Sequence, residues 1–184
     1  MTSCGDDDPI VDPVDNTGIQ VQNGLFMTID GEDPSSSAIM SPEVVEANDF
    51  KSQERAGFVS GYMYLESGSY KIVEITDKAI SATFGGAAET IADGASSDCD
   101  NSTIYRVATQ ADGSAFTVGE SGLYKVSHDQ QTGELIMFNI KEASAIGSAT
   151  ENGWGADTPM SGTVDANGAS WSVSDVILRN GEWK

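Results

Sequence analysis

A seven-residue motif occurs twice in this chain and limits its fold more than any other feature. Residues 66–72 read Glu-Ser-Gly-Ser-Tyr-Lys-Ile, residues 120–126 read Glu-Ser-Gly-Leu-Tyr-Lys-Val, and residues 180–184 form a looser third copy, Asn-Gly-Glu-Trp-Lys. Each copy follows a run of strand-forming residues, and its glycine supplies the positive φ that a tight turn requires. We therefore predict three hairpins, the third of which ends in mid-strand.

The residues after each motif glycine should alternate between the two faces of a strand. Successive side chains of a strand point in opposite directions. We therefore expect Tyr70 and Tyr124 in the core, and Lys71 and Lys125 in solvent.

The spacing of turn residues predicts the fold class. Turn signals recur about every 8–12 residues, and those at 77–78 and 130–133 predict a second hairpin after each of the first two motif copies. β-Branched residues alternate between these turns, which indicates an all-β chain of antiparallel β-sandwich modules, Ig-like or carbohydrate-binding-like. Two segments are predicted not to form strands. Residues 42–50 are predicted as a short helix capped by Ser41, and residues 85–101 as a long surface loop.

Three parts of the chain differ in composition. Residues 1–20 are acidic, contain proline and have no hydrophobic period, as in a tether. Residues 21–141 are predicted to form a β-sandwich domain. Residues 142–184 should begin a second β-module that is incomplete at its C-terminal end, leaving an open sheet edge.

The net charge of the chain limits the kinds of ligand that it can bind. The chain holds 9 Lys and Arg against 29 Asp and Glu, a net charge of −20. Such a field repels phosphate backbones and anionic lipid surfaces, which argues against nucleic-acid binding. A negatively charged chain can bind neutral ligands or cations, and its charge favours high solubility. The two cysteines, Cys4 and Cys99, do not have the spacing of a metal site.

Catalytic and metal sites have little support in the sequence. His128 precedes Asp129, but no nucleophile motif accompanies the pair, so we expect His128 on a surface strand and no enzymatic activity. Calcium binding is a more serious option than catalysis, because hard cations prefer oxygen ligands on loops. Two acidic loops supply weak calcium candidates, at Asp30, Asp33, Asp98 and Asp100.

Tryptophans are the best candidates for a binding site. The apolar face of a sugar packs on an aromatic ring, while nearby polar side chains bind its hydroxyls. Trp154 lies between two glycines in the loop of residues 145–160, and Asp157 follows it. Trp154 is therefore either a core residue or a stacking platform, and its place before the third motif copy favours packing. Trp171 is also a glycan candidate, although Trp171 and Trp183 occupy expected strands, where a core position is favoured.

Several segments resemble one protein family. Residues 145–160 (Ala-Ile-Gly-Ser-Ala-Thr-Glu-Asn-Gly-Trp-Gly-Ala-Asp-Thr-Pro-Met), then Ala-Ser-Trp at 169–171 and Leu-Arg-Asn-Gly-Glu-Trp-Lys at 178–184, resemble SusE/SusF-type outer-membrane glycan-binding lipoproteins of starch-utilisation-type systems. Cys4 and the Gly-Asp-Asp-Asp run after it resemble the lipidation and export signal of surface lipoproteins in Bacteroidota-type Gram-negative bacteria. Ser148 departs from this family, which usually has Asp there.

The resemblance implies a function and a location. It implies lipidation at Cys4, extracellular display at the outer membrane, and non-catalytic glycan capture. Membrane contact would then occur only through the lipid. The alternative from the residues themselves is a structural or assembly subunit whose edge strand pairs with a neighbouring protein.

Overall fold

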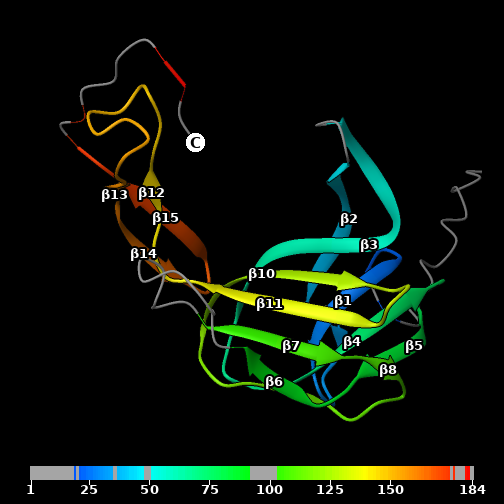
Figure 1. Cartoon of the computed structure of the whole chain (residues 1–184). Coiled ribbons are helices and arrows are strands. Elements are labelled where there is room, and N and C mark those ends of the chain that lie inside the picture. Colours follow the sequence, from blue (N-terminus) through cyan, green and yellow to red (C-terminus); the bar gives the residue numbers. More distant parts are fainter. Residues whose placement is uncertain are drawn as a thin grey trace, which may run out of the picture.

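The computed structural model describes residues 19, 21–34, 37–47, 51–91, 103–174, 176 and 181–182 (Figure 1). The strands are β1 (Gly24–Ile29), β2 (Ala38–Ala47), β3 (Lys51–Leu65), β4 (Gly68–Thr76), β5 (Ala79–Gly85), β6 (Ala88–Ile91), β7 (Ile104–Ala108), β8 (Gln110–Ala111), β9 (Phe116–Val118), β10 (Gly122–Asp129), β11 (Glu134–Ile140), β12 (Ser144–Ala145), β13 (Thr158–Pro159), β14 (Ser161–Asp165) and β15 (Gly168–Ser172). The all-β prediction is confirmed.

The first eleven strands form one curled antiparallel sheet (Figure 1). Its order is β6-β7-β11-β10-β3-β2-β1-β4-β5-β8, and β9 pairs with β4. β2 makes the bend, because its start pairs with β1 and its remainder pairs with β3. The register shifts between Pro42 and Val44, and such an irregularity bends and twists a strand.

The helix predicted over residues 42–50 is wrong. Val44 and Val45 lie in β2 and pair with Glu54 and Gln53 of β3; residues 48–50 lie outside the described residues. A helix of nine residues is marginal on its own. Strand pairing and the β-branched valines outweigh the local capping signal.

The concave side of the sheet holds the core. Strand alternation brings large apolar side chains from both halves of the sheet into one cluster. Its buried members are Leu25, Met27, Met40, Val59, Met63, Leu65, Tyr70, Ile72, Val107, Phe116, Val118, Tyr124, Val126, Leu135 and Met137. The predicted core positions of Tyr70 and Tyr124 are confirmed.

A smaller cluster packs on the other face of β1 and β4. Phe26, Val73 and Ile75 are buried there, and Ile19 and Val21 pack against them together with Ile39. The backbone N–H of Ile19 donates to the carbonyl of Lys78 at 2.9 Å. The end of the predicted tether therefore contacts the sheet.

The repeated motif forms corners, and the prediction of hairpins at residues 66–72 and 120–126 is wrong. β3 and β4 are not neighbours in the sheet, and neither are β9 and β10, so each motif carries the chain between distant strands. In both copies the tyrosine hydroxyl donates to the carbonyl of the motif glutamate, at 3.0 Å for Tyr70 and 2.7 Å for Tyr124. The two corners touch, because the Ser67 N–H donates to Ser121 Oγ.

The second predicted hairpin after each motif is confirmed. β4 and β5 pair through a turn in which Asp77 and Lys78 have φ of 51° and 62°. β10 and β11 pair through a turn that ends at Gly133, with φ of 72°. The loop predicted over residues 85–101 is interrupted by β6, which pairs with β7, and its residues 92–101 lie outside the described part of the chain.

Beyond Ile140 the chain leaves the large sheet. β12 pairs with β13, and β14 pairs with β15 as a hairpin that rises from one end of the sheet (Figure 1). The described residues include no helix with the length and apolar character needed to cross a membrane.

Candidate functional site

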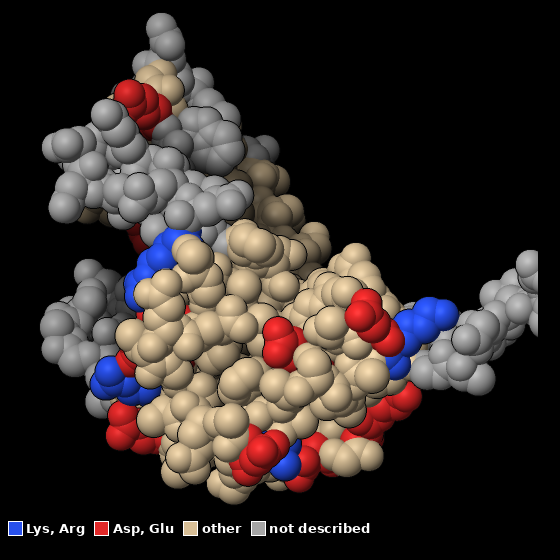
Figure 2. All heavy atoms as spheres, turned by 90° about the vertical axis from the view of Figure 1, so that its right-hand side faces the viewer, with Lys and Arg blue, Asp and Glu red and all other residues tan. Residues whose placement is uncertain are grey.

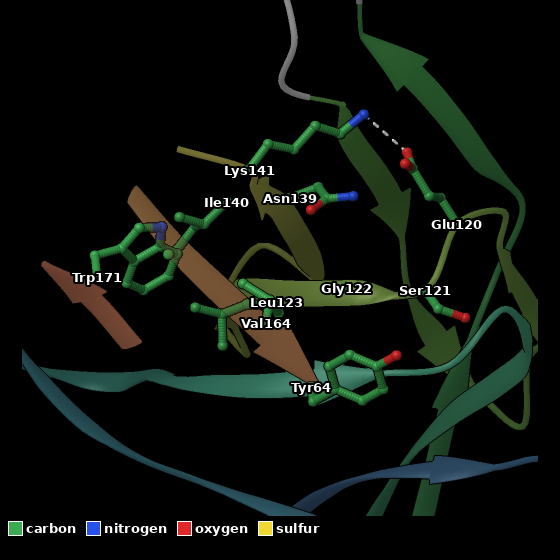
Figure 3. A pocket seen from close by; sticks show the side chains of 11 residues that line it. Tyr64, Glu120, Ser121, Gly122, Leu123, Asn139, Ile140, Lys141, Val164 and Trp171 are labelled. Atoms are coloured by element: carbon green, nitrogen blue, oxygen red, sulfur yellow. Dashed lines mark ion pairs between the residues drawn. The ribbon is translucent and has the colours of Figure 1, made fainter. Parts of the chain in front are cut away.

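An open hollow lies where the β14–β15 hairpin meets the large sheet (Figure 3). Its volume is about 280 Å³, near the lower end for a small-ligand site. Trp171 and Tyr64 stand on two sides of it, and the Lys141–Glu120 pair lies along another (Figure 3). This arrangement combines aromatic rings with charged, hydrogen-bonding groups.

Strand register sets the apolar floor of the hollow. Leu123 of β10 pairs with Tyr64 of β3 on one side and with Ile140 of β11 on the other. These three side chains point outward because their neighbour Tyr124 points into the core. Val164 of β14 completes the floor from the hairpin.

Trp171 is held by a glycine on the facing strand. It pairs with Gly162 across the hairpin, and a Cβ at Gly162 would collide with the Cδ1 of Trp171. The indole therefore lies against the Gly162 backbone, a packing that no other residue at position 162 permits. Trp171 is half-buried beside the hollow and outside the core, so its predicted core position is wrong.

A hydrogen-bonded chain supports the polar side of the hollow. The Nδ2 of Asn139 donates to the Tyr124 hydroxyl at 3.2 Å, and that hydroxyl donates to the Glu120 carbonyl. Burial, reinforced by Tyr105 and the Glu120 charge, raises the pKa of Tyr124, which keeps its hydroxyl protonated. Lys141 Nζ lies 3.0 Å from Glu120 Oε2, with both side chains partly exposed.

Trp154 lies on a separate loop, away from the hollow. Its side chain is 51% exposed. Thr150 is buried in this loop, and its hydroxyl lies within hydrogen-bonding distance of the carbonyls of Gly147 and Gly153. Asp157 Oδ2 accepts a hydrogen bond from Ser144 Oγ at 2.8 Å. Of the three glycan candidates only Trp171 lines the hollow, and Trp183 lies outside the described residues.

The remaining predicted sites are the calcium candidates and the cysteines, of which only Asp30 and Asp33 lie within the described residues. Asp30 pairs with Lys71 at 3.5 Å, and Asp33 lies in the same loop. Asp98, Asp100, Cys4 and Cys99 lie outside the described residues. Across the described part of the chain, no group of three or more His, Cys, Asp or Glu side chains is placed to hold a metal ion.

His128 is buried, and its predicted surface position is wrong. Only 1% of it is exposed, and it points into the sheet beside Phe84. Its Nε2 lies 3.1 Å from Thr109 Oγ1, which itself donates to the Gly133 carbonyl. Nε2 is therefore the protonated nitrogen, and Nδ1 is a buried acceptor without a hydrogen-bond partner among the described residues.

The fold also determines the protonation states of His128 and Asp129. Desolvation lowers the pKa of His128, although Asp129 opposes this shift. Desolvation acts to raise the pKa of Asp129, but hydrogen bonds from Gln131 and Thr132 and the paired Arg55 guanidinium together lower it. His128 is therefore neutral near pH 7, and Asp129 is ionised.

Five polar and aromatic residues of the hollow were not predicted as site residues: Tyr64, Glu120, Ser121, Asn139 and Lys141. Tyr64 could have been found, because it alternates with the apolar Met63 and Leu65 and so must face outward. The meeting of these residues with Trp171 depends on how the hairpin packs on the sheet, which no local pattern contains.

No family model, no curated protein and no solved structure matches this chain.

Proposed function

We propose that this chain is a non-catalytic glycan-binding protein, and that the hollow between the sheet and the β14–β15 hairpin is its binding site. The observation that carries this proposal is the partly exposed Trp171 ring beside a hollow that also holds Tyr64 and a charged pair. Aromatic rings stack on the apolar face of a sugar ring, and the polar groups bind its hydroxyls.

Rigid placement supports this proposal. The Trp171 ring lies against Gly162, and the polar groups are attached to strand ends held by the Tyr124 hydrogen bonds. A preordered site loses less conformational freedom on binding, which favours affinity.

The proposal is tested by titrating the protein with soluble pullulan, mannan, xylan and β-1,4-galactan while its tryptophan fluorescence and heat of binding are recorded. We expect at least one polysaccharide to bind. Trp171→Ala should weaken that binding at least about tenfold, as for an aromatic hot spot. Val173→Ala removes a neighbouring exposed apolar side chain outside the hollow and should leave the affinity unchanged. Absence of binding to all four polysaccharides rejects the proposal.

The Trp154→Ala variant distinguishes glycan binding in the hollow from glycan binding at the exposed loop. If Trp154→Ala abolishes binding and Trp171→Ala does not, the glycan contact lies on the loop of residues 145–160. That outcome would retain the binding function and reject the hollow as its site.

The proposed location is the cell surface, with a lipid on Cys4 as the anchor and a SusE/SusF-type role in capturing glycans at the outer membrane. The resemblance of residues 4–8 and 145–184 to such lipoproteins supports it. Mass spectrometry of the membrane-extracted protein should find an acylated Cys4. Cys4→Ser should move the protein to the soluble fraction, and its retention in membranes would contradict the proposal.

A second candidate function is that of an assembly subunit. β6 ends the large sheet and, among the described strands, pairs only with β7. A free strand edge can pair with a strand of another chain. Light scattering tests this candidate, since a strict monomer at high protein concentration argues against self-assembly.

A further inference from the structure

The polar side of the hollow carries both signs of charge at one place. Lys141 Nζ and Glu120 Oε2 lie 3.0 Å apart, and roughly a third of the Lys141 side chain and half of the Glu120 side chain are exposed. A ligand in the hollow can therefore reach a cation and an anion together (Figure 3).

We infer that this pair makes the hollow selective for neutral sugar residues and excludes sugar acids. The inference rests on the proposed glycan-binding function and names the chemical class of ligand. A sugar hydroxyl both donates and accepts hydrogen bonds. Adjacent hydroxyls can therefore donate to the Glu120 carboxylate and accept from the Lys141 ammonium.

A sugar carboxylate does not fit the same pair. It can only accept hydrogen bonds when ionised, so Lys141 would attract it while Glu120, 3.0 Å from Lys141, would repel it. Like charges placed together in a binding site are strongly unfavourable. The net charge of −20 adds a repulsive field for any anion that approaches.

Glu120 is also held in place by the fold. Its carbonyl accepts the hydrogen bond of the buried Tyr124, and its residue belongs to the corner before β10. Lys141 directly follows β11, which pairs with β10 throughout. The backbones that carry the two charges are therefore held near each other by the Tyr124 hydrogen bond and the β10–β11 pairing.

The test uses matched neutral and acidic polymers. Pullulan and mannan are each compared with the same polymer after oxidation of its C6 hydroxymethyl groups to carboxylates. We expect the wild-type protein to bind the neutral form at least about tenfold more tightly, since the Glu120 carboxylate repels the carboxylates of the oxidised form. Glu120→Gln keeps the shape of the side chain, removes the repulsion and leaves Lys141 unpaired. This variant should bind the oxidised polymer more tightly than wild type and lose most of the preference.

A matched control lies on the same sheet. Glu134 pairs with Arg106 and does not line the hollow, so Glu134→Gln removes an equal charge elsewhere and should leave the preference unchanged. The inference is overturned if wild type binds oxidised polymers as tightly as neutral ones, or if Glu120→Gln keeps the wild-type preference. It is also overturned if Glu134→Gln alters the preference equally, which would assign it to net charge. The proposed function survives these three outcomes, whereas failure to bind any polymer rejects both.

Discussion

At the scale of single residues, two tyrosines illustrate how the repeated motif stabilises the fold. Tyr70 and Tyr124 each donate to the carbonyl of the motif glutamate four residues earlier. Only Tyr124 also accepts a hydrogen bond from Asn139, and it is more deeply buried than Tyr70. The two motif copies therefore make the same tyrosine–carbonyl hydrogen bond, but the Tyr124 hydroxyl should contribute more to stability than the Tyr70 hydroxyl.

We predict that Tyr124→Phe destabilises the protein more than Tyr70→Phe does. Loss of the Tyr124 hydroxyl removes two hydrogen bonds and leaves the buried Asn139 amide without this partner, which costs about 1–3 kcal/mol. Loss of the Tyr70 hydroxyl removes one, at about 0.5–1.5 kcal/mol. Urea unfolding followed by circular dichroism measures both. Equal losses would show that the Asn139 contact contributes nothing.

Protonation of His128 should make stability depend on pH. Burial lowers its pKa below that of an unfolded histidine, about 6.5, so the unfolded chain takes up the proton first. The free energy of unfolding should therefore be highest above pH 6.5. It should fall as the pH decreases and level off once the folded state is protonated too. Urea unfolding at pH 7.5, 6.5, 5.5 and 5.0 measures this loss.

His128→Gln is the control for that loss. Glutamine can still donate to Thr109, as Nε2 does, but it does not titrate. Since His128 is the single histidine of the chain, the variant should lose the His-dependent decrease, although it is less stable overall. A wild-type and a variant curve of the same slope would contradict the assignment. Asp129, whose pKa is lowered, affects stability only at more acidic pH.

At the scale of secondary structure, local sequence predicted strands and turns but not their partners. Alternating residues identified the β4–β5 and β10–β11 hairpins, because burial of one strand face leaves a period of two. The motif at residues 66–72 has the same glycine whether it forms a hairpin or a corner, so its local pattern could not distinguish them. Residues 42–47 lie in a strand because β3 supplies pairing that a single segment does not reveal.

The candidate site was predictable only in part for the same reason. Trp171 stood out as an aromatic residue near the family-like segment. Glu120 and Lys141 are ordinary charged residues in sequence, and they meet because β10 and β11 pair in register. Their role becomes visible only once the hairpin of residues 161–172 is placed beside them.

The turn between β4 and β5 offers a stabilising substitution. Lys78 has φ of 62°, and a residue with a side chain pays about 1–2 kcal/mol in the left-handed region. Lys78→Gly should raise the free energy of unfolding by about 0.5–1 kcal/mol, because the greater freedom of glycine in the unfolded chain offsets part of the gain. The measurement is the urea midpoint.

Lys78→Ala is the matched comparison for this turn. It removes the same side chain but keeps a Cβ at positive φ, so it should give no comparable gain. If alanine stabilises as much as glycine, the effect comes from the lysine side chain and not from backbone strain.

At the scale of the whole molecule, charge and architecture have separate roles. On the face in Figure 2, acidic side chains are scattered and gather along the lower rim, with fewer basic ones among them. Such a distribution favours solubility and repels anions without creating one anionic site. The hydrophobic core lies almost entirely between strands of the large sheet. Binding, in contrast, is proposed where the later hairpin meets that sheet.

This division predicts that the large sheet folds without the segment that follows it. A chain ending at Glu142 keeps every strand from β1 to β11 and the whole hydrophobic core on the concave side of the sheet. Its free energy of unfolding should fall by less than about 2 kcal/mol, the cost of exposing one or two half-buried apolar side chains such as Leu123 and Ile140. Circular dichroism and urea unfolding measure this change.

The same shortened chain should bind no glycan, because Trp171 and Val164 are missing from the hollow. Full-length Trp171→Ala is the comparison, since it removes the ring while the hairpin backbone stays. Affinity electrophoresis in pullulan or mannan gels should show unretarded migration of both proteins beside a retarded wild type. A shortened chain that folds and is still retarded would place the glycan site on the large sheet alone. One that fails to fold would mean that residues 143–184 belong to the folding unit of the sheet.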